Sequence, residues 1–247
     1  MAVLKQGILG GGRNAVGTVV MSNWKGKDVI RARVSPSNPN TQAQQAARAL
    51  FRGLATLATY IMDSFIRPYW TRFENGTTAY NEWMRANQAL MRSALVPGNE
   101  DPGVFDPIKA LLARGGLTPA EVTGVADDGA GDTEVAFDGG AGEAGDAVAV
   151  VVLRKADGSL KGTYTGFTRG DGSAVIALPY ADHAMYVFHV LAYQPGDTPA
   201  STVLAVNSSI GFDDVGDPVI ATAADRQAAL AAANQVAAPA APAGALV

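Results

Sequence analysis

Hydrophobic and polar residues alternate near the start of the chain and predict a β-hairpin over residues 15–34. Its strands read AVGTVVM and DVIRARV, with a turn near Ser22-Asn23 or Lys25-Gly26. Successive side chains of a strand point to opposite faces, so the second strand has two distinct faces. We expect one face to pack and the other to be solvated or to bind an acidic partner. The first face holds Ile30, Ala32 and Val34, and the second holds Val29, Arg31 and Arg33.

A helical period follows the extended stretch SPSNPN at residues 35–40. The Thr41 hydroxyl can cap a helix. Apolar residues then recur every three or four positions, which is the spacing of one helix face. We expect Arg67-Pro68 to end this helix, because proline lacks the backbone N–H that a helix interior uses. The apolar stripe consists of Ala47, Leu50, Phe51, Leu54, Leu57, Ala58, Ile61 and Phe65.

A second helix is expected from about Thr78 to Leu95. Its outer face carries Arg85 and Arg92, and its inner face consists of Tyr80, Trp83, Met84, Asn87, Leu90 and Met91. Residues 97–107 are rich in Pro, Gly, Asn and Asp, which predicts a loop between this helix and the rest of the chain.

After Leu117 the pattern changes to short strands separated by turn residues. The strands are VAFD, AVAVVVL, GTYTGF, AVIALP, MYVFHVLAY and STVLAV. Strands spaced by roughly ten residues predict an antiparallel β-sandwich of the immunoglobulin or fibronectin kind. From Ala221 the chain is rich in alanine, and we expect a short helix around Asp225 to Val236. The final AAPAAPAGALV is a low-complexity stretch that is not expected to fold by itself.

Together these patterns predict an α+β fold that is mostly β. It consists of an N-terminal β-hairpin plus two helices, followed by an antiparallel Ig/fibronectin-III-like β-sandwich. We predict three parts: residues 1–116 as a basic strand-helix docking region, residues 117–215 as an acidic Ig-like β-sandwich, and residues 216–247 as an Ala/Pro-rich C-terminal tail.

Charge divides the chain in the same place. Residues 1–116 hold 14 Lys and Arg against 7 Asp and Glu, whereas residues 117–247 hold 5 against 16, so the net charges are +7 and −11. This asymmetry indicates regions with different partners or head-to-tail packing between copies, and uneven surface charge without a role would give the same numbers. The absence of cysteine excludes disulfides and thiolate metal sites. It suits a cytoplasmic protein or a particle assembled in the cytoplasm, and many secreted bacterial proteins also lack cysteine.

Targeting signals are not expected in this sequence. No apolar run approaches the roughly 18 residues that a membrane-spanning helix needs. The segment Met1 to Leu9 lacks the charged region, apolar region and cleavage site of a signal peptide.

The most informative candidate site is a basic cluster around one tryptophan. It consists of Trp24, Lys25, Lys27, Arg31, Arg33, Arg48 and Arg52. Basic side chains beside an aromatic ring can hold phosphates and stack a base of a nucleic acid. They can also protect a solvated strand edge from unwanted pairing. A third interpretation is docking on an acidic protein face, such as residues 117–247 of a neighbouring copy, and all three stay open.

Two sets of candidate catalytic or nucleotide-binding residues lack the partners that their chemistry requires. Gly10-Gly11-Gly12 is not followed by the Lys-Ser/Thr of a phosphate-binding loop. His183 and His189 are the only histidines, and neither has a motif partner for metal binding or nucleophilic catalysis. We therefore predict no catalytic residue and no cofactor, and we expect both histidines to be structural.

Two further motifs are weak. Acidic residues in and after the segment DDGAGD lack the EF-hand spacing, so an acidic solvated linker is favoured over a calcium site. Arg169-Gly170-Asp171 matches an adhesion tripeptide, but a hairpin with positive φ at Gly170 and Gly172 explains the same residues. The acidic residues are Asp127, Asp128, Asp132, Asp138 and Glu143.

Several blocks together resemble a known family. They are KQGILGG at 5–11, VGTVVMSNWKGKDVIR at 16–31, NPNTQAQQAARALF at 38–51, AYNEWMRANQALM at 79–91, LLARGGLT at 111–118 and ALPYADHAMYVFHVLAY at 177–193. The sequence resembles the DUF6266 family, uncharacterised proteins of Bacteroidetes and related phages, over about residues 4–212. It departs from the family pattern at Gly12-Arg13-Asn14 and in the alanine-rich tail. The resemblance implies a shared architecture and assigns no catalytic residue.

The expected function is that of a non-enzymatic structural or assembly protein. We expect a phage virion component, capsid- or tail-associated, that forms homo-oligomers or docks on other virion proteins and is assembled in the bacterial cytoplasm. One alternative is a cytoplasmic nucleic-acid-binding accessory protein that uses the basic N-terminal face. A further alternative is an adhesin-like surface-binding module.

Overall fold

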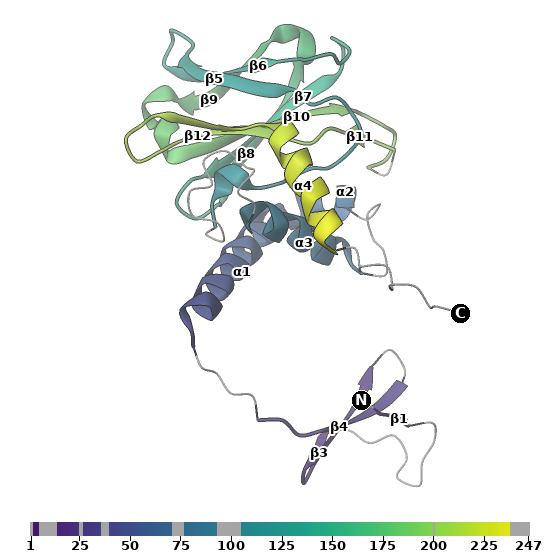
Figure 1. Cartoon of the computed structure of the whole chain (residues 1–247). Coiled ribbons are helices and arrows are strands. Elements are labelled where there is room, and N and C mark those ends of the chain that lie inside the picture. Colours follow the sequence, from purple (N-terminus) through teal and green to yellow (C-terminus); the bar gives the residue numbers. More distant parts are fainter. Residues whose placement is uncertain are drawn as a thin grey trace, which may run out of the picture. The chain divides into compact units, whose positions relative to one another are not determined.

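The computed structural model describes residues 2–4, 14–24, 27–35, 40–70, 77–92, 105–199 and 201–237. The chain forms two compact units, residues 1–41 and residues 42–247. The first contains a small antiparallel sheet, and the second contains helices followed by antiparallel sheets. The predicted α+β class is confirmed (Figure 1).

Residues 1–41 contain a four-stranded antiparallel sheet instead of a simple hairpin. Its strands are β1 (Ala2–Leu4), β2 (Asn14–Val16), β3 (Val19–Trp24) and β4 (Lys27–Ala32), in the order β1-β4-β3-β2. The predicted first strand is interrupted by a turn at Gly17-Thr18, where Gly17 has a φ of +59°. This left-handed conformation favours glycine, which has no Cβ to clash with the backbone.

The two predicted helical regions are present. The first comprises α1 (Gln42–Ile61), the π-helical segment η1 (Met62–Ile66) and α2 (Arg67–Trp70), and the second is α3 (Ala79–Arg92). The Thr78 hydroxyl accepts a hydrogen bond from the Asn81 backbone N–H at 3.3 Å and so caps α3. The apolar stripe of the first region is buried at Leu50, Leu54, Leu57, Ala58, Ile61 and Phe65, whereas Ala47 and Phe51 are exposed.

The expected end of the first helix at Arg67-Pro68 is wrong. The π-helical segment shifts the backbone register just before the proline, and the Arg67 N–H bonds to the Met62 carbonyl. Pro68 therefore enters at the second residue of a new helical turn. Proline is tolerated in a first turn because its missing N–H would have no helical partner there.

The rest of the chain forms two antiparallel sheets. The three-stranded sheet has the order β5-β6-β9, formed by Glu121–Asp127, Asp132–Asp138 and Ser173–Pro179. The six-stranded sheet has the order β13-β12-β10-β7-β8, and β11 pairs with β10 outside this path. Its strands are β7 (Ala147–Arg154), β8 (Leu160–Thr168), β10 (Tyr186–Gln194), β11 (Val203–Leu204), β12 (Ser208–Phe212) and β13 (Pro218–Ala221).

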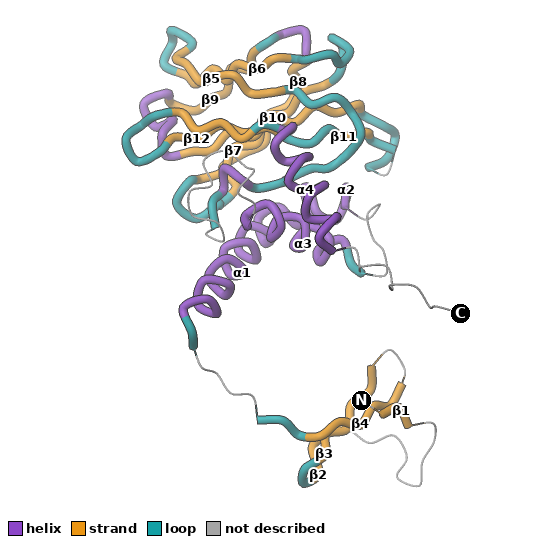
Figure 2. Tube along the Cα trace, viewed as in Figure 1, coloured by secondary structure: helices purple, strands orange, loops and turns teal. Residues whose placement is uncertain are grey.

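Both faces of the six-stranded sheet carry a hydrophobic cluster. On one face, Val150 and Phe188 pack with Val135 and Phe137 of the three-stranded sheet. On the other face, Val151, Val187 and Leu191 pack with the helices. Figure 2 shows the resulting layers of strands and helices in residues 42–247. The alternation along β7 and β10 produces this arrangement, because neighbouring residues of a strand face opposite clusters.

The C-terminal region contributes to the fold, which corrects the interpretation of residues 216–247 as a tail. Strand β13 pairs with β12, and α4 (Ala223–Ala237) follows it and includes the expected short helix. Arg226 is fully buried, and Ala229 and Leu230 belong to the cluster beneath the six-stranded sheet. The low-complexity prediction for the last residues falls largely on 238–247, outside the described residues.

The compact units divide at residues 41 and 42, not at the predicted boundary of 116 and 117. The reason is that α1 and α3 share one hydrophobic cluster with β7, β10 and α4. A boundary between residues 116 and 117 would separate side chains that bury one another. Among the described helices, none combines the length and apolar character needed to cross a bilayer.

Candidate docking surface

The sheet of residues 1–41 presents part of the predicted basic cluster. Arg31 lies opposite Val20 in the β3–β4 ladder, and Arg33 follows two residues later. Both side chains are exposed. Trp24 and Lys27 are register partners at the closed end of the same hairpin. Their side chains, and the whole of Lys25, lie outside the described part.

Arg48 and Arg52 belong to the other compact unit. They are exposed on α1 and lie one helical turn apart. The predicted basic cluster is thus distributed over two units: Trp24, Lys25, Lys27, Arg31 and Arg33 in residues 1–41, and Arg48 and Arg52 in residues 42–247.

The apolar side chains of the small sheet are poorly covered. The predicted packed face is wrong in detail, because Ala32 is exposed and Val34 is 77% exposed, whereas Val29 on the predicted solvated face is buried. Among the hydrophobic residues of this unit whose side chains are described, Val29 alone is buried. The others of this set are partly or fully accessible, including Val19, Val20, Met21 and Ile30. The described strands of this unit form one layer, and a single layer buries few apolar side chains.

An acidic surface lies at one end of the sheets in residues 42–247. It combines the β5–β6 loop, the 3₁₀ segment η5 (Tyr180–Met185) and the β12–β13 loop. The Tyr180 N–H bonds to the Gly131 carbonyl at 2.9 Å, and the His183 ring packs edge-on against Phe212 at 4.6 Å. We call this surface the acidic end; its carboxylates are Asp127, Asp128, Asp132, Asp182, Asp213, Asp214 and Asp217.

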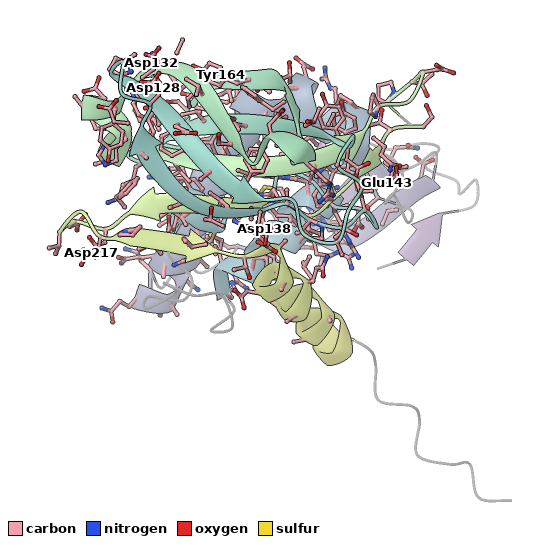
Figure 3. All side chains as sticks on the ribbon, turned by 90° about the horizontal axis from the view of Figure 1, so that it is seen from above. Asp128, Asp132, Asp138, Glu143, Tyr164 and Asp217 are labelled. Carbon is pink, nitrogen blue, oxygen red and sulfur yellow. The ribbon has the colours of Figure 1, made fainter. Side chains whose placement is uncertain are left out.

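Local hydrogen bonds hold the acidic end in shape. Figure 3 shows Asp128 and Asp132 together at one hairpin and Asp217 at another. The Asp213 carboxylate accepts the backbone N–H groups of Asp217, Val215 and Gly216 at 2.7–2.9 Å. These bonds, led by the one from Asp217, lower the pKa of Asp213, so this carboxylate stays charged at neutral pH. Lys155 pairs with Asp214 at 3.1 Å.

The family of unknown function DUF6266 matches residues 10–205. The chain belongs to this family. No curated protein and no solved structure matches it.

The DUF6266 match covers β2 to β4, the helices α1 to α3 and the strands β5 to β11. Strands β12 and β13 and helix α4 lie beyond the matched range, so the buried Arg226 does too. The family description supplies no activity, and roles for individual residues rest on the structure.

The Arg169-Gly170-Asp171 tripeptide is not displayed as an adhesion ligand would be, because Arg169 is buried. The Arg169 side chain is buried, pairs with Asp146 at 2.9 Å and donates to the carbonyls of Thr118, Pro119 and Gly139. Asp171 bonds to the Thr168 backbone N–H at 2.7 Å. Gly172 has the expected positive φ of +69°, but Gly170 does not. The arginine therefore holds loops together and is not available to a receptor.

The two histidines have structural contacts. His189 is fully buried: its Nε2 lies 3.1 Å from the Pro107 carbonyl, and its Nδ1 lies 2.9 Å from the Asn207 side-chain amide. Burial, and secondly the charge of Arg226, holds the pKa of His189 well below its usual value. His183 stacks on Tyr180 with ring centroids 4.3 Å apart.

The remaining candidates add no site. Among the described residues, no group of three His, Asp or Glu side chains is arranged to hold a metal ion. Asp127 and Asp128 accept backbone N–H groups within their own loop, for example from Gly129 and Ala130 at 2.8 Å. Gly10-Gly11-Gly12 lies outside the described residues.

Sequence reasoning missed a buried polar network around residues 107–113. This segment, which we call the buried strap, runs between helices and sheet and is bonded from both sides. Trp83 and Asn87 of α3 bond to Leu111, and Asn207 bonds to Ala110 and Leu112. Arg226 and Ser209 both donate to the Ile108 carbonyl, at 2.7 and 2.6 Å. Only the apolar run IKALLA hinted at burial, and nothing local indicated its partners.

Proposed function

We propose that this protein is a non-enzymatic assembly protein whose residues 1–41 dock on the acidic end of another copy. The observation that carries the proposal is the small N-terminal sheet, in which Val29 alone is buried among the hydrophobic residues whose side chains are described. A sheet with an uncovered apolar face gains stability when a partner supplies the missing layer. Docking therefore completes a structure that the sheet lacks by itself.

Charge favours an acidic partner. Residues 1–41 hold six Lys and Arg and one Asp, a net charge of +5, and residues 42–247 hold 13 Lys and Arg and 22 Asp and Glu, a net charge of −9. Opposite charges steer the encounter and select the orientation of an interface. Two copies can thus associate head to tail, and such a contact builds rings or filaments when repeated.

The proposal extends to the particle that contains the protein and to the type of its fold. We extend the proposal to a phage virion component that is assembled in the bacterial cytoplasm. We assign the two packed sheets to an Ig/fibronectin-III-like sandwich, supported by the hydrophobic cluster that both sheets share. A neighbouring virion protein with an acidic face would suit the same basic sheet.

The test replaces four basic residues of the sheet. Lys25, Lys27, Arg31 and Arg33 become Gln, and a control variant carries Gln at Arg67, Arg92, Arg154 and Lys161, which are exposed in the other unit. Both variants lose the same charge. Exposed ion pairs each contribute about 0–1 kcal/mol, so four replacements together produce a measurable change. Light scattering after size-exclusion chromatography should show oligomers for the native chain and the control, and smaller species for the sheet variant.

Nucleic-acid binding is the alternative that exposed Arg31 and Arg33 favour, and the same proteins test it. Affinity for DNA or RNA should fall steeply with salt if these residues contact phosphates, and the sheet variant should flatten that dependence. Tight, salt-steep binding with unchanged self-association would replace the assembly proposal with an accessory nucleic-acid-binding function. A native chain that stays monomeric and binds neither polymer would refute both.

A further inference from the structure

A cavity of about 250 Å³ lies between the helices and the six-stranded sheet. Its floor is apolar and largely buried, formed by Phe65, Ala149, Leu191 and Leu204. Hydroxyl-bearing side chains complete the lining: Ser64, Tyr69, Thr163, Thr165 and Tyr193. Ligand sites in proteins typically combine such an apolar lining with a few placed polar groups.

The helix changes its form where it meets the cavity. Ser64 and Phe65 belong to the π-helical segment η1, and Tyr69 follows in α2. A π-helical turn is less favourable than a regular helical turn, and such turns are frequent at functional sites. Here the turn brings Ser64 and Phe65 into one lining with Tyr69, whose ring centroid is 6.4 Å from that of Phe65.

The polar groups of the cavity are free to bind a ligand. No hydrogen bond joins the hydroxyls of Ser64, Tyr69, Thr163, Thr165 or Tyr193 to another residue of the described part. Each hydroxyl can both donate and accept. The described lining residues include no Asp, Glu, Lys, Arg or His, so they offer no charged partner to a charged ligand.

We propose that this cavity binds one pyranose unit of an uncharged carbohydrate. A pyranose ring has hydroxyl groups around its rim and an apolar face of C–H groups. The hydroxyl side chains match the rim, and Phe65, Tyr69 and Tyr193 offer aromatic surface for the apolar face. The assignment concerns the helical side of the sheet and does not depend on docking by residues 1–41.

Strand β8 supplies a matched control. Thr163 lies opposite Val151, whose side chain belongs to the helix-facing cluster. Tyr164, the next residue, lies opposite Val150 and packs against the cluster on the other face, near the three-stranded sheet (Figure 3). Removing the Tyr164 hydroxyl therefore changes the same strand without changing the cavity.

The experiment measures binding of neutral methyl pyranosides, namely glucoside, galactoside, mannoside and N-acetylglucosaminide, to the full-length protein. Saturation-transfer NMR reports contact, and titration of tyrosine ring signals gives affinity. Thr163→Val and Tyr193→Phe should each weaken the best-bound pyranoside about fivefold, the value of one hydrogen bond, while Tyr164→Phe should leave binding unchanged. Thermal unfolding verifies that all three variants fold.

Three results would overturn the proposal. The first is no saturation transfer to any of the four pyranosides. The second is equal weakening by Tyr164→Phe, which would place the binding site elsewhere. The third is tighter binding of an apolar probe such as indole that both hydroxyl-removing variants retain, which would assign the cavity to apolar ligands.

Discussion

The two compact units bury their apolar residues in different ways. In residues 42–247 the six-stranded sheet is covered on both faces, by the helices on one and by the three-stranded sheet on the other. In residues 1–41 a single sheet leaves most of its described hydrophobic side chains accessible. Residues 42–247 bury their apolar residues within their own layers, whereas the small sheet of residues 1–41 leaves apolar surface accessible. The docking role proposed for the small sheet rests on this difference.

The largest expected effect comes from truncation. Residues 42–247 alone should keep the unfolding temperature of the full chain, because both hydrophobic clusters remain intact. Residues 117–247 alone should lose cooperative unfolding, because removal of the helices and the buried strap exposes Val151, Leu153 and Leu191 to water. Circular dichroism during heating measures both. Cooperative unfolding of residues 117–247 would restore the boundary predicted from composition.

A single core substitution should sharpen the comparison. Leu57 is fully buried in α1, so Leu57→Ala should lower the free energy of unfolding by about 2–5 kcal/mol. Val34 is 77% exposed in the N-terminal unit, and Val34→Ala should change it by at most about 0.5 kcal/mol. Urea denaturation gives both values. Equal losses would mean that Val34 is covered as well as Leu57.

The smallest expected effect is a pH dependence of the free energy of unfolding of residues 42–247. His189 is held neutral when folded, whereas in the unfolded chain it gains a proton below its usual pKa of 6.5. The unfolded state then binds more protons, so the free energy of unfolding should fall as pH drops below 6.5, by up to about 1.4 kcal/mol per pH unit. Urea denaturation at several pH values should show this slope.

Two variants isolate that slope. His189→Gln should remove it, and His183→Gln is the matched control for the loss of an imidazole elsewhere in residues 42–247. The exposed Asp213 carboxylate titrates in a separate, more acidic range, since its pKa lies below 3.8. A slope that persists in His189→Gln would point to another buried titrating group.

Local sequence patterns were sufficient to predict the helices and strands that have one apolar face and one polar face. The three- and four-residue spacing from Leu50 to Phe65 identified the buried face of α1 and η1, and the outer face of α3 at Arg85 and Arg92 is exposed as expected. The apolar runs AVAVVVL and MYVFHVLAY identified the strands β7 and β10. These predictions succeed because a helix or strand buries one side at a fixed period, and that period is written in consecutive residues.

The candidate site was predicted only in part. Arg31 and Arg33 are exposed as expected, but neither their distribution over two units with Arg48 and Arg52 nor the cavity beside the π-helical turn could be read from spacing. The cavity combines residues from positions 64 to 204, and no local pattern connects them.

What the sequence determined by itself is therefore local: the periods of helices and strands, the excess of basic residues at one end and the blocks shared with DUF6266. What the tertiary structure decided is which polar residues are buried. Arg169 belongs to a tripeptide that a hairpin turn would expose, yet its side chain is buried and pairs with Asp146. Arg226 donates a hydrogen bond to the Ile108 carbonyl, 118 positions away in the chain. A buried charge is stable only when its partners converge on it, and residues so distant in sequence meet only in the folded chain.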